Sequence, residues 1–111
     1  MMNEDRLIAL LDFLEKDPSD EFTRFALALE YRKLGRTDEA VEQLELLRSR
    51  SPDYVGTYYH LGSMYREAGD AEQARAVLKM GAKAADNQRD HHAKAEILSL
   101  LNELDDIDPF A

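Results

Sequence analysis

Helix breakers recur at a fixed interval along this chain. Successive breakers lie 17 residues apart, at Pro18, Gly35, Pro52 and Gly69. Proline cannot continue a helix, and glycine favours the left-handed conformation that ends one, so each interval has room for one helix of about 13 to 15 residues and a short turn. The spacing therefore predicts a stack of helical hairpins.

The sequence pattern itself returns after two such intervals. A shift of 34 residues superposes Pro18 on Pro52, Tyr31 on Tyr65, Gly35 on Gly69, Ala40 on Ala74 and Leu44 on Leu78. Small alanines let the second helix of a pair approach the first, and the glycines make the tight turn between the two. The repeating unit is therefore one helix pair.

Apolar residues within the intervals follow helical rather than strand periodicity. Six helices are predicted, over residues 3–16, 20–34, 37–50, 53–68, 71–85 and 88–104. In the first helix the apolar residues are spaced so that they gather on one face; they are Leu7, Leu10, Leu11 and Leu14. This face needs a partner to cover it, because the rest of the helix is charged.

Residues 55–88 resemble one unit of the tetratricopeptide repeat family, a helix-turn-helix of 34 residues. The matching positions are Tyr58, Leu61, Gly62, Tyr65, Gly69, Asp70, Ala74 and Leu78. Asp86 stands where the family has a closing proline. Residues 21–54 are a second copy, in which Arg24 occupies the place of the aromatic residue and Ala28 that of the hairpin-packing glycine.

The resemblance implies an all-α fold: a right-handed superhelix, or α–α solenoid, of two helix-turn-helix repeats with a flanking helix at each end. A single domain, residues 1–111, is then expected to contain an N-terminal cap helix (3–17), repeat 1 (21–54), repeat 2 (55–88), a C-terminal capping helix (89–104) and an acidic tail (105–111). We expect that tail to be frayed or ordered only on contact.

Charge and composition narrow the classes of partner. The chain has 23 acidic and 14 basic residues and a net charge of −9, which disfavours nucleic acid and anionic membrane surfaces as partners. It has no cysteine, no N-terminal stretch typical of a signal peptide and no uncharged run long enough to cross a membrane. We therefore expect a cytoplasmic protein.

No motif in the sequence indicates catalysis. The chain lacks a glycine-rich phosphate loop, a His-Glu-x-x-His pattern and a serine in a nucleophile elbow. His91 and His92 are neighbours that would point about 100° apart on a helix, which is an awkward arrangement for chelating one metal ion. We expect no catalytic residue, no metal site and no cofactor.

In the tetratricopeptide family, the first helices of successive units line a concave groove that holds an extended peptide or a partner's helix. Carried over to this chain, the groove positions are Phe22, Phe25, Leu29, Arg32 and Lys33 in repeat 1 and Tyr59, His60, Ser63 and Arg66 in repeat 2. Aromatic residues and arginines are enriched at interface hot spots. The alternative is that Phe22 and Phe25 pack under the first helix and that the arginines are solvated.

The function implied by the resemblance is a non-enzymatic adaptor that binds a protein or peptide. Arg32 and Arg66 lie one repeat apart and could pair with a carboxylate of an acidic peptide or of a chain terminus. A second hypothesis is a homo-oligomer, because so few repeats leave apolar end faces that another copy can cover. In one form of it, residues 105–111 dock in the groove of a neighbouring molecule.

One subgroup of the family, the co-chaperones that grip the C-terminal carboxylate of heat-shock proteins, uses a set of lysine, asparagine and arginine side chains in the groove. The corresponding positions here hold Phe25, Leu29, His60, Asp90 and Lys94. The resemblance therefore does not extend to that carboxylate clamp.

Overall fold

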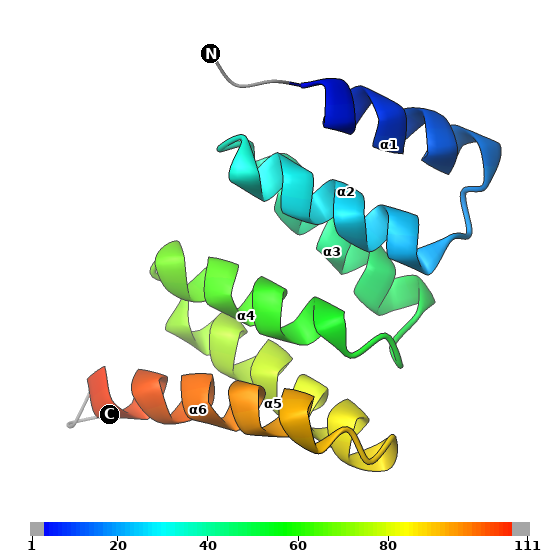
Figure 1. Cartoon of the computed structure of the whole chain (residues 1–111). Helices are drawn as coiled ribbons and strands as arrows, with labels where there is room; N and C mark the ends of the chain where they lie inside the picture. The colour runs from blue at the N-terminus through cyan, green and yellow to red at the C-terminus, as the bar shows by residue number, and fades with distance from the viewer. Residues whose placement is uncertain (1–3, 108–111) are drawn as a thin grey trace. The chain divides into compact units, whose positions relative to one another are not determined.

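The computed structural model describes residues 4–107, and over this range the chain forms six α-helices and no strand. The helices are α1 (Asp5–Lys16), α2 (Glu21–Lys33), α3 (Thr37–Arg50), α4 (Gly56–Glu67), α5 (Ala71–Asn87) and α6 (His91–Ile107), as Figure 1 shows. The prediction of an all-α chain built from helical hairpins is confirmed.

The helices divide into two compact units, Met1–Ser51 and Pro52–Ala111. In the first unit α2 packs against both α1 and α3, and in the second unit α4, α5 and α6 all pack against one another (Figure 1). The hairpins α2–α3 and α4–α5 lie within the repeat ranges 21–54 and 55–88, but α4 begins at Gly56 rather than at the predicted residue 53. Each helical hairpin thus lies in its own unit, together with one flanking helix.

The turns inside the two hairpins share one geometry. Gly35 and Gly69 adopt left-handed conformations with φ of 78° and 82°. The amide that follows each glycine donates to a carbonyl of the preceding helix, from Arg36 to Tyr31 at 2.8 Å and from Asp70 to Tyr65 at 2.9 Å. These are the bonds that satisfy the last carbonyls of a helix when glycine ends it. The predicted glycine turns are confirmed.

The turn between α5 and α6 differs from the prediction. Without a proline at Asp86, α5 continues to Asn87 and α6 begins at His91, so the predicted boundaries at residues 85 and 88 are wrong. The chain reverses at Arg89, which holds a left-handed φ of 56° although it is not glycine. The Asp90 amide then donates to the Ala85 carbonyl at 2.9 Å, as in the glycine turns.

The end of α6 also lies beyond its predicted position. The helix runs to Ile107 rather than residue 104, and the Asp105 carboxylate accepts a hydrogen bond from Arg75 of α5 at 3.3 Å. The first residues of the predicted acidic tail are therefore helical. Residues 108–111, and with them the hypothesis of a docked tail, lie outside the described residues.

Close approach of α5 to α4 and α6 is made possible by a glycine. A Cβ atom at Gly81 would lie 2.3 Å from Tyr58 Cβ and 3.1 Å from Ile97 Cδ1. Tyr58 is fully buried there, and its hydroxyl donates to the Pro52 carbonyl at 2.5 Å. The aromatic residue of repeat 2 thus fills the centre of its unit and also fixes the loop that precedes α4.

Helix α1 is only partly covered within its unit. Of its apolar stripe only Leu7 is buried, while Leu11 remains 42% exposed. Ile8 and Phe13, which lie beside the stripe, are 63% and 65% exposed. The apolar stripe thus finds a partner in α2, with Leu10 and Leu14 half-buried beside Leu7, and its cover is partial because α2 is the helix of this unit that packs against α1.

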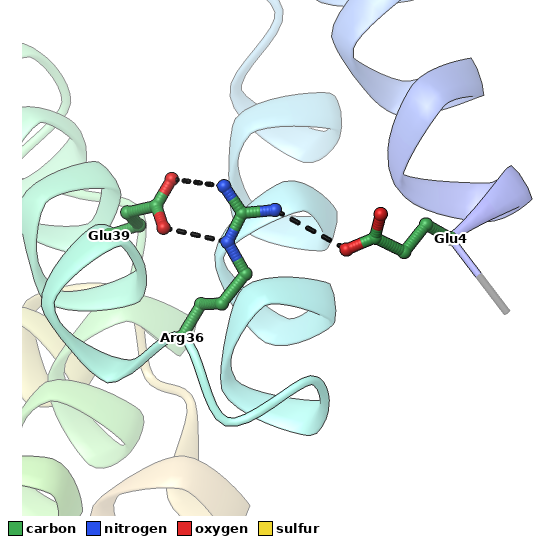
Figure 2. A network of polar contacts seen from close by, with 3 residues as sticks. All are labelled: Glu4, Arg36 and Glu39. Carbon is green, nitrogen blue, oxygen red and sulfur yellow. Dashed lines mark hydrogen bonds and ion pairs between the residues drawn. The ribbon is translucent and has the colours of Figure 1, made fainter. Parts of the chain in front are cut away.

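Charged residues secure the start of α1 within its unit, as Figure 2 shows. Arg36 makes two 2.7 Å contacts with the carboxylate of Glu39 and one of 3.5 Å with Glu4, which precedes α1. The hydrogen bonds to Glu39 raise the pKa of Arg36 above its usual range. The guanidinium also stacks over the ring of Tyr31 at 4.9 Å. Of these contacts the one with Glu4 reaches the start of α1, and it contributes little to stability because both side chains are partly solvated.

Candidate functional site

The five groove residues predicted for repeat 1 lie on one face of α2, which we call the α2 face; they are Phe22, Phe25, Leu29, Arg32 and Lys33. The first four are successively three, four and three residues apart and Lys33 follows Arg32 directly, which places all five within about a third of the helix circumference. Phe22 is 69% exposed, so the alternative in which it packs under α1 is wrong for this residue. Phe25, Leu29 and Arg32 are half-buried.

The register of this face is set where α2 begins. The carboxylate of Asp20 accepts a hydrogen bond from the amide of Thr23 at 3.2 Å, which caps the first turn. Acidic residues favour this end of a helix and basic residues the other, and α2 ends with Arg32 and Lys33. Two cations therefore gather at one end of the α2 face, and Phe22 lies at the other.

In the second unit, predicted groove residues line a pocket between α4 and α6 with a volume of about 410 Å³, which we call the α4–α6 pocket. Its lining residues are Tyr59, Ser63 and Arg66 of α4 and His92, Ala95, Glu96, Ser99, Leu100 and Glu103 of α6. Three of the four residues predicted for repeat 2 thus share one pocket. The fourth, His60, is not among the lining residues.

His60 instead supports the aromatic wall of the pocket. Its ring meets that of Tyr59 edge to face, with centroids 5.6 Å apart and planes at 87°. This arrangement is favourable because the positive edge of one ring faces the negative face of the other. The Ser63 hydroxyl is 3.5 Å from a carboxylate oxygen of Glu67, on the same helix.

The sequence does not predict the α6 side of the pocket, because the resemblance indicates only a capping role for that helix. Its polar lining residues are His92, Glu96, Ser99 and Glu103. They are spaced by four, three and four residues, which places them on one helical face. This polar stripe was visible in the sequence, but nothing in the sequence indicated that it faces α4.

Arg66, predicted to recognise a carboxylate, already holds one in this structure. Its Nη1 lies 2.6 Å from Oε2 of Glu103, across the pocket from α4 to α6. On α6 itself, His92 Nε2 lies 3.2 Å from Glu96 Oε1. With neutral histidine the pocket therefore carries one positive and two negative side chains, and it is not a bare cationic site.

The α2 face and the α4–α6 pocket each combine apolar side chains with a few charged ones. Among the residues that the structure describes, no group of three or more histidine, aspartate and glutamate side chains could hold a metal ion. Within the same part of the chain no helix has the length and apolar character needed to cross a membrane. What the two surfaces offer is aromatic and aliphatic area beside a small number of charges, the mixture common in protein interfaces.

Comparison with known proteins finds similar repeats. The tetratricopeptide repeat family matches residues 31–98. A tetratricopeptide repeat domain protein from Salinibacter ruber, solved by NMR, has a TM-score of 0.80 and 32% identity over 86% of this chain and 96% of its own. A protein from Bordetella parapertussis shares the fold, with a TM-score of 0.80 and 24% identity over 97% of this chain and 92% of its own.

A curated relative is the tetratricopeptide repeat and J domain-containing co-chaperone DNJ1 of Fusarium oxysporum f. sp. lycopersici. The two are 31% identical over 71 residues, which make up 64% of this chain and 14% of the relative. The chain thus matches only a small part of that protein's length.

Proposed function

This chain belongs to the tetratricopeptide repeat family, whose domains are generally non-catalytic and interact with proteins, and from that premise we propose that it is a non-enzymatic adaptor for a protein segment. The segment is an extended peptide or a helix of the partner. Tyr59 in the α4–α6 pocket is one apolar anchor, and Phe25 and Leu29 on the α2 face are the others. Arg32 and Arg66 recognise acidic groups of the partner.

The α4–α6 pocket is the observation that carries this proposal. The family resemblance points to Tyr59, Ser63 and Arg66 as groove residues, and they line one pocket of about 410 Å³ with a second helix as its opposite wall. That volume is enough for one or two side chains of a partner, and pockets of this size are common for small ligands. An aromatic wall beside a paired arginine suits a segment with an apolar residue next to an acidic one.

Recognition of an acidic residue at Arg66 requires an exchange of carboxylates. Glu103 must leave the arginine when the partner's carboxylate arrives, and the number of ion pairs at Arg66 stays the same. Exchange of one ion pair for another contributes little binding free energy, because Arg66 and Glu103 are both partly solvated. We therefore expect the apolar anchors to supply most of the affinity and Arg66 to supply the preference for an acidic residue.

A display library of random peptides, selected on the full chain, tests the proposal. Selected peptides should combine an apolar and an acidic residue, lose at least about tenfold in affinity on Tyr59→Ala, and lose their acidic preference on Arg66→Ala. Arg75→Ala is the matched control, since Arg75 is a similarly half-buried arginine that pairs with Asp105 outside the pocket. Equal losses from Arg66→Ala and Arg75→Ala, or binding that ignores Tyr59, would refute the proposal.

The exposed apolar side chains of α1 favour a second candidate function, a self-associating structural subunit. Ile8, Leu11 and Phe13 leave apolar area on this helix that another copy could cover. Light scattering after size exclusion, over about a hundredfold in concentration, distinguishes the two. A dimer that dissociates on Ile8→Ser and Phe13→Ser, but not on Tyr59→Ala, would favour self-association through α1, whereas a monomer at all concentrations would exclude it.

A further inference from the structure

A charged side chain is buried in the first unit, away from the surfaces described above. Arg24 of α2 is only 8% exposed, and its Nη2 donates to the Pro18 carbonyl at 2.9 Å and its Nη1 to Gln43 Oε1 at 2.7 Å. No carboxylate among the described residues pairs with it. A guanidinium has five N–H donors, so the described acceptors satisfy two of them.

The second repeat shows that the structural part of this role does not need a charge. A shift of 34 residues places Arg24 on Tyr58 and Pro18 on Pro52, and the Tyr58 hydroxyl donates to the Pro52 carbonyl. The two side chains thus make the same anchoring bond, one with a neutral group and one with a cation. Burying an uncompensated cation is costly, so the charge of Arg24 calls for an explanation other than the anchor.

Arg24 lines a pocket of about 380 Å³. The lining residues come from the start of α2 and the end of α3, two helix ends that lie side by side in Figure 1. The lining residues of this Arg24 pocket are Pro18, Ser19, Glu21, Arg24, Leu47, Arg50 and Ser51. It carries two arginines against one glutamate, a local excess of one positive charge in a chain whose net charge is −9. Burial lowers the pKa of Arg24, and repulsion from Arg50 lowers it further.

We propose that the Arg24 pocket binds a carboxylate, held between the guanidinium groups of Arg24 and Arg50. A planar guanidinium presents paired donors that match the two oxygens of a carboxylate, and the hydroxyl of Ser51 supplies a further donor. The Ser19 hydroxyl already donates to the Asp17 carboxylate at 2.9 Å. A singly charged anion suits the site better than a phosphate dianion. The lining residues have one surplus positive charge, and Glu21 repels any further negative charge on the ligand. Arg24 lies about 100° around α2 from Phe25, so this site is separate from the α2 face.

An NMR titration of the full chain with acetate tests the proposal. The titration is made at constant ionic strength and follows the Nε–Hε signals of the arginines. The signals of Arg24 and Arg50 should shift in a saturable way. Arg50→Gln should weaken binding about fivefold without disturbing the anchor of Arg24, and Glu21→Gln should strengthen it about threefold because it removes the opposing charge. Arg24→Gln should abolish it.

Lys79→Gln is the matched control, since it removes one positive charge from an exposed position of α5 in the other unit and should leave acetate binding unchanged. An acetylated and amidated peptide with one central aspartate separates two sources of the carboxylate: tighter binding than acetate supports a protein segment, and equal binding a small free carboxylate. Equal shifts with chloride, tighter binding of phosphate than of acetate, or no effect of Arg50→Gln and Glu21→Gln would overturn the proposal.

Discussion

The packing of Tyr58 against Gly81 gives a prediction whose size follows from the structure. In Gly81→Ala, the new Cβ would lie 2.3 Å from Cβ and 2.8 Å from Cγ of Tyr58. Carbon atoms in contact prefer about 3.5 to 4.0 Å, so α4 and α5 must separate by more than about 1 Å. No change of Tyr58 rotamer relieves this, because its Cβ is fixed to the backbone.

The cost follows from two opposing effects. Forcing an extra methyl group into a packed core costs about 1 to 3 kcal/mol, and a clash with an atom fixed to the backbone belongs at the upper end. Replacing glycine by alanine inside a helix stabilises the helix by about 1 kcal/mol, which offsets part of this cost. We therefore expect Gly81→Ala to lower the free energy of unfolding by about 2 kcal/mol, which for a domain of this size lowers the melting temperature by about 8 °C.

Urea denaturation followed by far-UV circular dichroism measures this loss, and Gly62→Ala is the matched comparison. A Cβ at Gly62 would lie 2.5 Å from Cγ and Cδ2 of Leu78, atoms of a side chain that can move. The first repeat already has an alanine, Ala28, at the equivalent position, and this residue is fully buried. A hairpin of this kind can therefore accommodate a methyl group there. Gly62→Ala should therefore cost about 1 kcal/mol less than Gly81→Ala. A Gly81→Ala protein as stable as the parent, or more stable than Gly62→Ala, would refute the packing argument.

Three further predictions concern the second unit. Arg89→Gly should raise the free energy of unfolding by about 0.5 to 1 kcal/mol, because a left-handed φ is unfavourable for arginine; a loss of stability in thermal denaturation would contradict this. Glu103→Gln should change stability by less than about 0.5 kcal/mol but free Arg66, so that acidic peptides selected on the chain bind about threefold more tightly by calorimetry. The hydrogen bond from Lys94 and the positive charge of that residue hold the pKa of Asp86 below its ordinary value of 3.8. The stability that this ion pair supplies is therefore present above about pH 4 and is lost as the pH falls through the lowered pKa. An NMR titration in which Lys94→Met leaves the pKa of Asp86 unchanged would show that Lys94 is not the cause.

The sequence predicts the turns inside the two hairpins well because their causes are local. Gly35 and Gly69 are required by a left-handed backbone conformation, and Asp70 caps α5 by accepting a hydrogen bond from the amide of Gln73 at 3.1 Å. Each of these interactions spans only a few residues. A pattern of residue types at fixed spacing is enough to predict such features.

Helix lengths and the coverage of α1 are less predictable, because they depend on competing tertiary contacts. Asp86 was visible as a departure from the repeat, but the sequence does not show how far α5 continues without proline. The extension of α6 is accompanied by an ion pair between Asp105 and Arg75, which are 30 residues apart. The exposure of Ile8 depends on which face of α1 meets α2, and amphipathicity alone does not determine that.

Half of the α4–α6 pocket could be predicted and half could not, for a similar reason. Repeat register places Tyr59, Ser63 and Arg66 on one face of α4, and the structure brings them to one pocket. Glu103 lies 37 residues beyond Arg66 on a helix without the repeat signature. Its pairing with Arg66 depends on how α6 packs against α4, which no local pattern specifies.

The two repeats also differ at two equivalent positions that lie close together in each unit. In the second unit Tyr58 lies against Gly81, and the equivalent residues of the first unit are Arg24 and Leu47, which line the Arg24 pocket together. The second unit fills this place in the hairpin with the large ring of Tyr58 against a glycine. The first unit fills the same place with the thinner, charged side chain of Arg24 and a leucine. The arginine and leucine of the first unit leave a cationic pocket between them. Arg24 departs from the repeat pattern and so weakens the resemblance of residues 21–54 to the family. The same departure gives the first repeat a binding chemistry that the second repeat lacks.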